Sequence, residues 1–146
     1  MELQSPDKGR HLGAITDLFA KAFGDYSEWI DYGRDGYLEG APYDWEASRV
    51  GIVDGEVATH LGVWDFTMRI GTATARLAGI GAVATQRKLS GRGLMTRTAA
   101  DAIESLRGAG YDMSLLFGIP NYYLRFGYVG TFPQSTFCVS TSDLVP

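Results

Sequence analysis

The sequence has no long apolar run, one cysteine and two histidines, and each shortage excludes a class of protein. No stretch reaches the roughly 20 apolar residues of a membrane-spanning helix, and the opening MELQSPDKGRHLG lacks the apolar core of a secretory signal. Cys138 alone cannot form an internal disulfide, so a cytoplasmic location is expected. His11 and His60 beside one cysteine are too few for a His/Cys metal site, and no metal is expected.

Length and composition are those of one compact domain. Of the 146 residues, 45% are hydrophobic and 21% are charged, close to the averages of soluble globular proteins. The chain has no repeat and no low-complexity tract, so we expect a single domain over residues 1–146.

Charge is distributed unevenly along the chain. Residues 1–73 hold 13 Asp and Glu against 6 Lys and Arg, whereas residues 74–146 hold 4 acidic residues against 7 basic ones. Four of these bases fall within eleven residues, namely Arg87, Lys88, Arg92 and Arg97. The pattern indicates an anionic partner at one end of the molecule and a cationic partner at the other, with solvated surface charge as the alternative.

Hydrophobic periodicity predicts an α/β (α+β) domain whose first half is largely antiparallel. Helical spacing predicts helices near 12–23, 27–38, 93–108 and, shorter, 121–126. After a short edge strand at the start, strands are predicted at 49–53, 56–66, 72–85, 113–118 and 136–140. Asp54-Gly55 predicts a tight hairpin turn, because both residues readily take positive φ.

The most informative segment is the run QRKLSGRGLM at 86–95, between a strand and a helix. A glycine-rich turn that leads into a helix leaves main-chain N–H groups unpaired, and the helix dipole adds about half a positive charge. With Arg87, Lys88 and Arg92 the loop suits a pyrophosphate, and an ordinary basic turn is the alternative. GIGAVA at 79–84 lies inside a strand, which argues against a dinucleotide fingerprint, and a Gly-Lys-Ser/Thr P-loop is absent.

Three short motifs resemble the GNAT superfamily of acyl-CoA-dependent N-acetyltransferases. They are VAT at 83–85, RGLM at 92–95 and YLRFGY at 123–128, and with SLLFGIP at 114–120 they most resemble the first domain of the enhanced-intracellular-survival type of acetyltransferase. Within the loop, Gly93 matches the central glycine of the family pattern, whereas Ser90 replaces its Gln or Arg and Met95 replaces its small final residue.

This resemblance implies a fold and a co-substrate. The GNAT sheet is mixed and mostly antiparallel, splayed between its fourth and fifth strands and flanked by about four helices. The co-substrate would be acetyl-CoA, whose pantetheine arm would pair with the backbone of Gly81, Ala82 and Val83. Asn121 and the loop would also bind it, the loop residues being Ser90, Gly91, Arg92, Gly93, Leu94 and Met95.

The resemblance also assigns the proton donor. A tyrosine hydroxyl has a pKa near 10, so at neutral pH it can protonate a departing thiolate, whose own pKa is near 8.5. Tyr123 takes this role, with Tyr122 as the alternative. Arg125 and Phe126 are expected to be structural, as an ion-pair partner and a core anchor, and His60 to be a hydrogen-bonded packing residue.

The acceptor side is less defined. FGDYSEWID at 23–31 offers carboxylates to attract a cation and rings to stack on it, and the expected substrate residues are Asp25, Tyr26, Glu28 and Trp29. A solvated helix face is the alternative, and no general base is assigned.

Together these features predict an N-acetyltransferase that moves an acetyl group from acetyl-CoA directly to an amine, with a cationic small molecule as the acceptor. A protein amine is an alternative acceptor, and a non-catalytic acyl-CoA-binding or regulatory module is an alternative function. No nucleic acid or membrane partner is expected, and a homo-oligomer is left open. The closing DLVP at 143–146 resembles the start of a linker, so a piece of a larger protein is a third interpretation.

Overall fold

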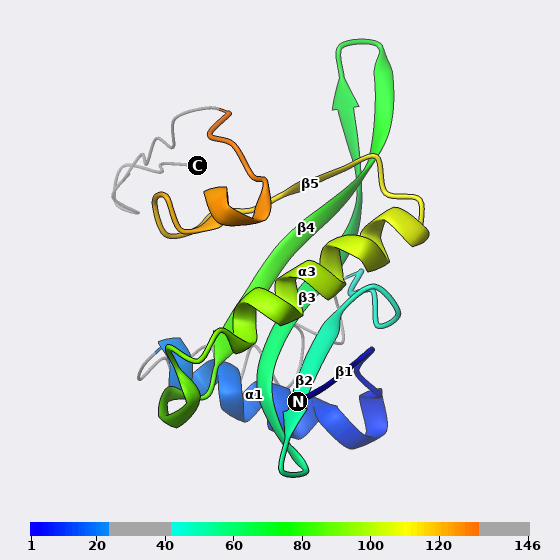
Figure 1. Cartoon of the computed structure of the whole chain (residues 1–146). Coiled ribbons are helices and arrows are strands. Elements are labelled where there is room, and N and C mark those ends of the chain that lie inside the picture. Colours follow the sequence, from blue (N-terminus) through cyan, green and yellow to red (C-terminus); the bar gives the residue numbers. More distant parts are fainter. Residues whose placement is uncertain (24–41, 132–146) are drawn as a thin grey trace, which may run out of the picture.

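The computed structural model describes residues 1–23 and 42–131, which form a five-stranded sheet in the order β1-β2-β3-β4-β5 with helices on its faces (Figure 1). The strands are β1 (Glu2–Gln4), β2 (Arg49–Val53), β3 (Glu56–Ile70), β4 (Ala73–Thr85) and β5 (Met113–Leu115). The helices are α1 (Lys8–Phe23) and α3 (Leu94–Gly108), and the 3-10 turns are η2 (Arg87–Leu89) and η3 (Tyr123–Phe126). Neighbouring strands are antiparallel except β4 and β5, which are parallel.

The two long helices pack on opposite faces of the sheet (Figure 1). The apolar side of α1 places Ile15 and Leu18 in one core cluster, which also contains Trp64 of β3. The apolar side of α3 places Ala99 and Leu106 in a second cluster on the other face. Burial of these faces is the main favourable contribution to the stability of the sheet and its helices.

Strand β4 pairs with β5 over three residues and then continues without this partner. Its pairing with β5 covers Leu77, Ala78 and Gly79, whereas its pairing with β3 continues to Thr85. Figure 1 shows β5 running away from β4 beyond this point. Residues 80–85 therefore have an edge that β5 does not cover, which confirms the predicted splay between the fourth and fifth strands.

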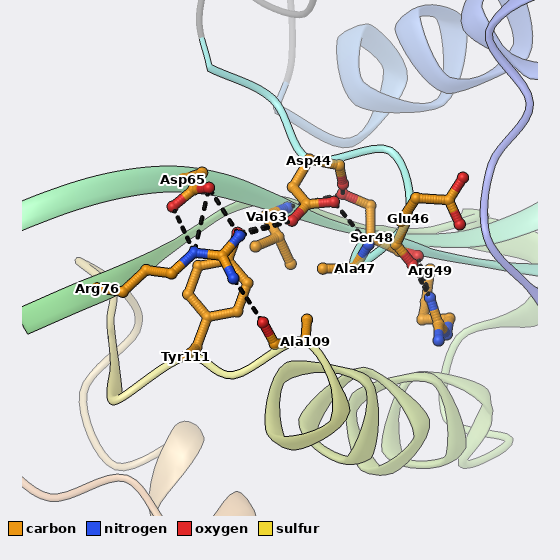
Figure 2. Close-up of polar contacts among 10 residues, drawn as sticks. All are labelled: Asp44, Glu46, Ala47, Ser48, Arg49, Val63, Asp65, Arg76, Ala109 and Tyr111. Atoms are coloured by element: carbon orange, nitrogen blue, oxygen red, sulfur yellow. Dashed lines mark hydrogen bonds and ion pairs between the residues drawn. The ribbon is translucent and has the colours of Figure 1, made fainter.

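A polar cluster joins the turn before β2 to the paired end of β4 and β5 (Figure 2). The hydroxyl of Tyr111 donates a hydrogen bond to Asp44 Oδ2 at 2.7 Å. The guanidinium of Arg76 lies 4.0 Å from the centroid of the Tyr111 ring and donates to Asp65 and to the carbonyl of Ala109. Three segments that are distant in sequence are thereby held together.

Most of the predicted elements are confirmed, with differences at their ends: α1 begins at Lys8 and β3 continues to Ile70. The hairpin at 49–66, the long strand ending at Thr85 and the helix ending at Gly108 all form. The basic loop contains the short turn η2, and the strand predicted at 113–118 ends at Leu115. It ends there because β4 diverges and offers no further backbone partner. The helix predicted at 27–38 and the strand predicted at 136–140 lie outside the described residues.

Within residues 1–23 and 42–131, no helix is both long enough and apolar enough to cross a membrane.

Asp44→Ala is expected to lower the free energy of unfolding by about 2–3 kcal/mol, because it removes charge-assisted hydrogen bonds from the Tyr111 hydroxyl and the Ala47 N–H. The matched control is Glu46→Ala in the same turn, where the side chain is exposed, and a change below about 0.5 kcal/mol is expected. Urea unfolding measures both. Equal losses in the two variants would contradict the role given to Asp44.

Candidate functional site

The loop between β4 and α3 presents open main-chain N–H groups. Gly91 and Gly93 have φ of 76° and 72°, which residues with a Cβ rarely adopt. Gly93 is also the N-cap of α3 and has no side chain to cap the helix. No acceptor in the described part of the chain bonds to the N–H groups of residues 91–96. Together with the helix dipole, these groups form a site suited to an anion.

Basic side chains surround this loop. Arg87 and Arg92 are exposed. Lys88 forms an ion pair with Glu56 of β3 at 3.2 Å, and its hydrogen bond lowers the pKa of that carboxyl. All three predicted cations are thus exposed beside the loop, and the ion pair links Lys88 to β3.

The uncovered edge of β4 leads directly into the loop. Gln86 N–H donates to the Ala58 carbonyl of β3 at 2.8 Å, and Ala84 lies opposite His60. Main-chain groups alternate in direction along a strand, so Gln86 and Ala84 turn theirs toward β3. Val83 precedes Ala84 and has the opposite direction in this alternation, so it turns its N–H and C=O toward the edge that β5 does not cover.

A β-bulge interrupts β4 just before this position. The register changes by one residue, from Gly62 opposite Gly81 to His60 opposite Ala84. Ala82 lies in this bulge and has a φ of 47° although it is not glycine. A left-handed backbone costs a residue with a Cβ about 1–2 kcal/mol, so neighbouring contacts must hold it.

The contacts that hold the bulge come from His60. Its Nδ1 lies 2.8 Å from the Ala82 carbonyl oxygen, and its Nε2 lies 2.8 Å from the Tyr43 hydroxyl. Because a carbonyl only accepts, Nδ1 carries the proton and the Tyr43 hydroxyl donates to Nε2. Burial lowers the pKa of His60 to about 4 and raises the pKa of Tyr43, so both are neutral near pH 7. The prediction that His60 is a hydrogen-bonded packing residue is confirmed.

Tyr123 borders an apolar cavity of about 10 Å³ within the second core cluster, too small to hold a ligand. Val83, Met95 and Leu116 line the same cavity. A Cβ on Gly118 would come within 2.4 Å of the Tyr123 ring, so a side chain there would displace the ring. Burial raises the pKa of the Tyr123 hydroxyl above its ordinary value, which keeps it protonated at neutral pH.

Tyr122 packs edge-on against Tyr123, with ring centroids 5.0 Å apart, and does not line that cavity. The Arg125 guanidinium lies 4.1 Å from the centroid of the Tyr122 ring. In the described residues Arg125 therefore makes a cation–π contact instead of the predicted ion pair, because the aromatic rings of its own turn are its neighbours. Phe126 packs against the second core cluster, as predicted.

A larger hollow of about 670 Å³ lies between α3 and the segment after β5. Asn121, Arg107 and Phe117 are among its lining residues, and Tyr123 borders it as well. Asn121 has a φ of 63°, which asparagine tolerates better than most residues. The predicted contact residue Asn121 and the predicted proton donor Tyr123 thus share one wall.

The predicted site residues fall into three groups. The structure brings Val83, Met95 and Tyr123 onto one cavity, and places the open N–H groups of the loop, including Leu94, at the start of α3. Gly81 pairs with β3, Ala82 bonds to His60, and Ser90 is exposed after η2. The expected substrate residues lie outside the described part of the chain: Asp25, Tyr26, Glu28 and Trp29.

Sequence reasoning missed that His60 and Tyr43 support the bulge and that Gly118 makes room for Tyr123. No signal in the order of residues marks a bulge among small apolar residues. Among the described residues, no cluster of three or more His, Cys, Asp or Glu side chains could hold a metal ion.

Comparisons with known proteins place the chain in a class of acyl-transferring domains. Residues 8–130 match the profile described as an acetyltransferase (GNAT) domain. The chain belongs to the GNAT acetyltransferase family, which confirms the resemblance seen in its motifs. No curated protein sequence matches the chain.

Solved structures of low identity share the fold. A probable N-acyltransferase from Enterococcus faecalis superposes with a TM-score of 0.71 at 18% identity, covering 86% of this chain and 31% of that one. Eis1 from Mycobacterium abscessus gives 0.69 at 18% identity, covering 88% and 31%. Glucosamine-6-phosphate N-acetyltransferase from Arabidopsis thaliana gives 0.67 at 11% identity, covering 95% and 98%. The chain therefore spans about a third of the first two proteins and nearly all of the third.

Thr96→Glu is expected to weaken CoA binding more than tenfold without destabilising the fold. Thr96 is exposed in the first turn of α3. A carboxylate there stabilises the helix by about 0.3–1 kcal/mol through the helix dipole, but it repels a bound diphosphate. Ala100→Glu, exposed one turn further along α3, adds the same charge and should change the affinity less than about threefold. Calorimetry measures the affinity, and equal weakening by both variants would contradict an anion site at the helix start.

The contribution of His60 to the free energy of unfolding is expected to fall by about 3 kcal/mol as the pH falls from 6.5 to 4. Across this window the unfolded chain protonates His60 while the folded protein keeps it neutral, so the unfolded state binds more protons. His60→Asn is uncharged at every pH. The stability advantage of the wild type over this variant should shrink between pH 7 and pH 4 in urea titrations. An advantage that stays constant over that range would show that His60 does not titrate as described.

Proposed function

We propose that the chain is an acetyl-CoA-dependent N-acetyltransferase that acetylates an amine by direct transfer. The observation that carries this proposal is that the edge of β4 left uncovered by β5 leads directly into the open N–H groups at the start of α3. A single ligand along that edge would have its anionic part at the start of α3 and its extended arm beside β4. Its reacting end would then lie beside a protonated tyrosine.

The residues present fit CoA. The open N–H groups of 91–96 and the exposed side chains of Arg87 and Arg92 suit a diphosphate. The main chain of Val83 suits an amide-bearing arm, because an extended ligand can bond to a free strand edge. When bound, acetyl-CoA supplies an activated acetyl thioester.

Tyr123 is assigned the transfer of a proton to sulfur. A bond forms between the amine nitrogen and the carbonyl carbon while the carbon–sulfur bond breaks. The Tyr123 hydroxyl gives its proton to the departing sulfur, the amine loses its excess proton to solvent, and solvent returns a proton to the Tyr123 oxygen. Since burial raises its pKa, this hydroxyl is still protonated at the pH where amines become nucleophilic.

The proposed acceptor is a cationic small molecule, with a protein amine as the alternative. Support comes from the acidic excess in residues 1–73, which contain 13 Asp and Glu but 6 Lys and Arg. The roles of Asp25, Tyr26, Glu28 and Trp29 on the acceptor side, a single domain over 1–146 and a cytoplasmic location are further parts of this proposal.

Tyr123→Phe is expected to lower kcat at least about 100-fold while changing the KM for acetyl-CoA less than about threefold, because only the proton donor is lost. Thiol release over a panel of amines measures both constants. Tyr122→Phe removes the same atom from the adjacent ring and should keep kcat within about threefold. The reverse ranking would transfer the role to Tyr122.

The same assay separates the enzyme from a non-catalytic module. Thermal stabilisation by acetyl-CoA without thiol release for any amine would indicate a non-catalytic CoA-binding module instead of an enzyme. Failure of CoA to stabilise the wild-type protein would reject both functions.

A further inference from the structure

We propose that His60 is a positioning residue for the acyl-CoA site: its ring holds the Ala82 bulge so that the Val83 N–H faces the bound pantetheine arm. This inference rests on the proposed function. It assigns a role at the site to a buried residue that contacts neither the loop nor the cavity of Tyr123.

The bulge needs an external support. Ala82 has a φ of 47° in the interior of a strand, and a strained backbone of this kind persists only where its surroundings determine it. The side chain of Ala82 is 7% exposed and packs in the first core cluster. Its carbonyl accepts a hydrogen bond from His60 Nδ1, and losing a hydrogen bond to a buried acceptor is costly.

The support is itself fixed. Tyr43 bonds to His60 Nε2, and its ring packs edge-on against Trp64, with centroids 5.1 Å apart. Gly62 leaves room for this ring, because a Cβ there would come within 3.0 Å of His60 Cε1. The imidazole is therefore held in one orientation and one tautomer.

The direction of the Val83 N–H follows from the geometry of the peptide bond. In a trans peptide the N–H points opposite to the carbonyl of the preceding residue, and no peptide bond in the described chain is cis. Because the Ala82 carbonyl points at His60, the Val83 N–H points away from it. The side chain of Val83 lines the cavity shared with Tyr123, so His60 sets the main chain next to the proposed reacting end.

Two substitutions separate the bond to Ala82 from the presence of a polar side chain. The amide nitrogen in His60→Asn occupies the position of Nδ1 and can still donate to Ala82. In His60→Gln the amide occupies the position of Nε2 and cannot. Calorimetry with acetyl-CoA should show at least tenfold weaker binding for His60→Gln, and binding within about threefold of the wild type for His60→Asn. Equal weakening by both variants would overturn the proposal.

A matched control separates positioning from general destabilisation. Val50→Ala opens a cavity in the same core cluster, on β2, without touching the bulge. At a temperature where all variants are folded, it should leave the affinity for acetyl-CoA unchanged. If His60→Gln weakens binding no more than Val50→Ala, the positioning role fails while the proposed function stands. If the wild-type protein binds no acetyl-CoA, the proposed function fails, and the positioning role with it.

The tautomer provides a test that needs no variant. Nitrogen NMR of the wild-type protein should show His60 protonated at Nδ1 and unprotonated at Nε2 at pH 7. The opposite tautomer would remove the hydrogen bond to the Ala82 carbonyl and overturn the proposal.

Discussion

Backbone pairing that stops partway along β4 is the constraint on which the rest of the structure depends. Beyond Gly79 this central strand has β3 as its neighbour on one side and no strand partner from β5 on the other. A free edge carries main-chain donors and acceptors that an extended ligand can bond. The edge ends at the glycine-rich turn and the uncapped start of α3, so strand edge and anion site are continuous from Val83 to Met95.

The edge of β4 that is open at residues 80–85 is covered toward the other end of the strand, where β4 pairs with β5. At the paired end, Arg76 N–H donates to Asp112 Oδ2 at 2.8 Å, and Asp112 N–H donates to the Arg76 carbonyl at 3.1 Å. The Arg76 side chain continues this closure through Asp65 and the Tyr111 ring, to which Asp44 is also bonded (Figure 2). These contacts fix β4 and β5 to each other at the paired end. Beyond it the two strands diverge, and α3 packs over β4.

The parts of the fold that could be predicted depend on local chemistry. Apolar spacing marked α3, Asp54-Gly55 marked the first hairpin, and the glycines of the loop marked the turn into the helix. The bulge at Ala82 could not be predicted, because GIGAVA has small or apolar residues on both faces and a shift of one residue leaves the pattern unchanged. The length of β5 depends on where a distant strand diverges. The contact between Gly118 and the Tyr123 ring depends on a fold of the chain that no spacing rule describes.

The most direct test of this account follows individual amide groups as ligand binds. In a nitrogen-15 NMR titration with CoA, the amide signals of Val83 and of residues 91–96 should shift most. Signals from the far end of the β3–β4 hairpin, at 69–74, should stay in place. Unchanged signals at Val83 and 91–96, with shifts confined to the hollow lined by Arg107 and Phe117, would contradict the account.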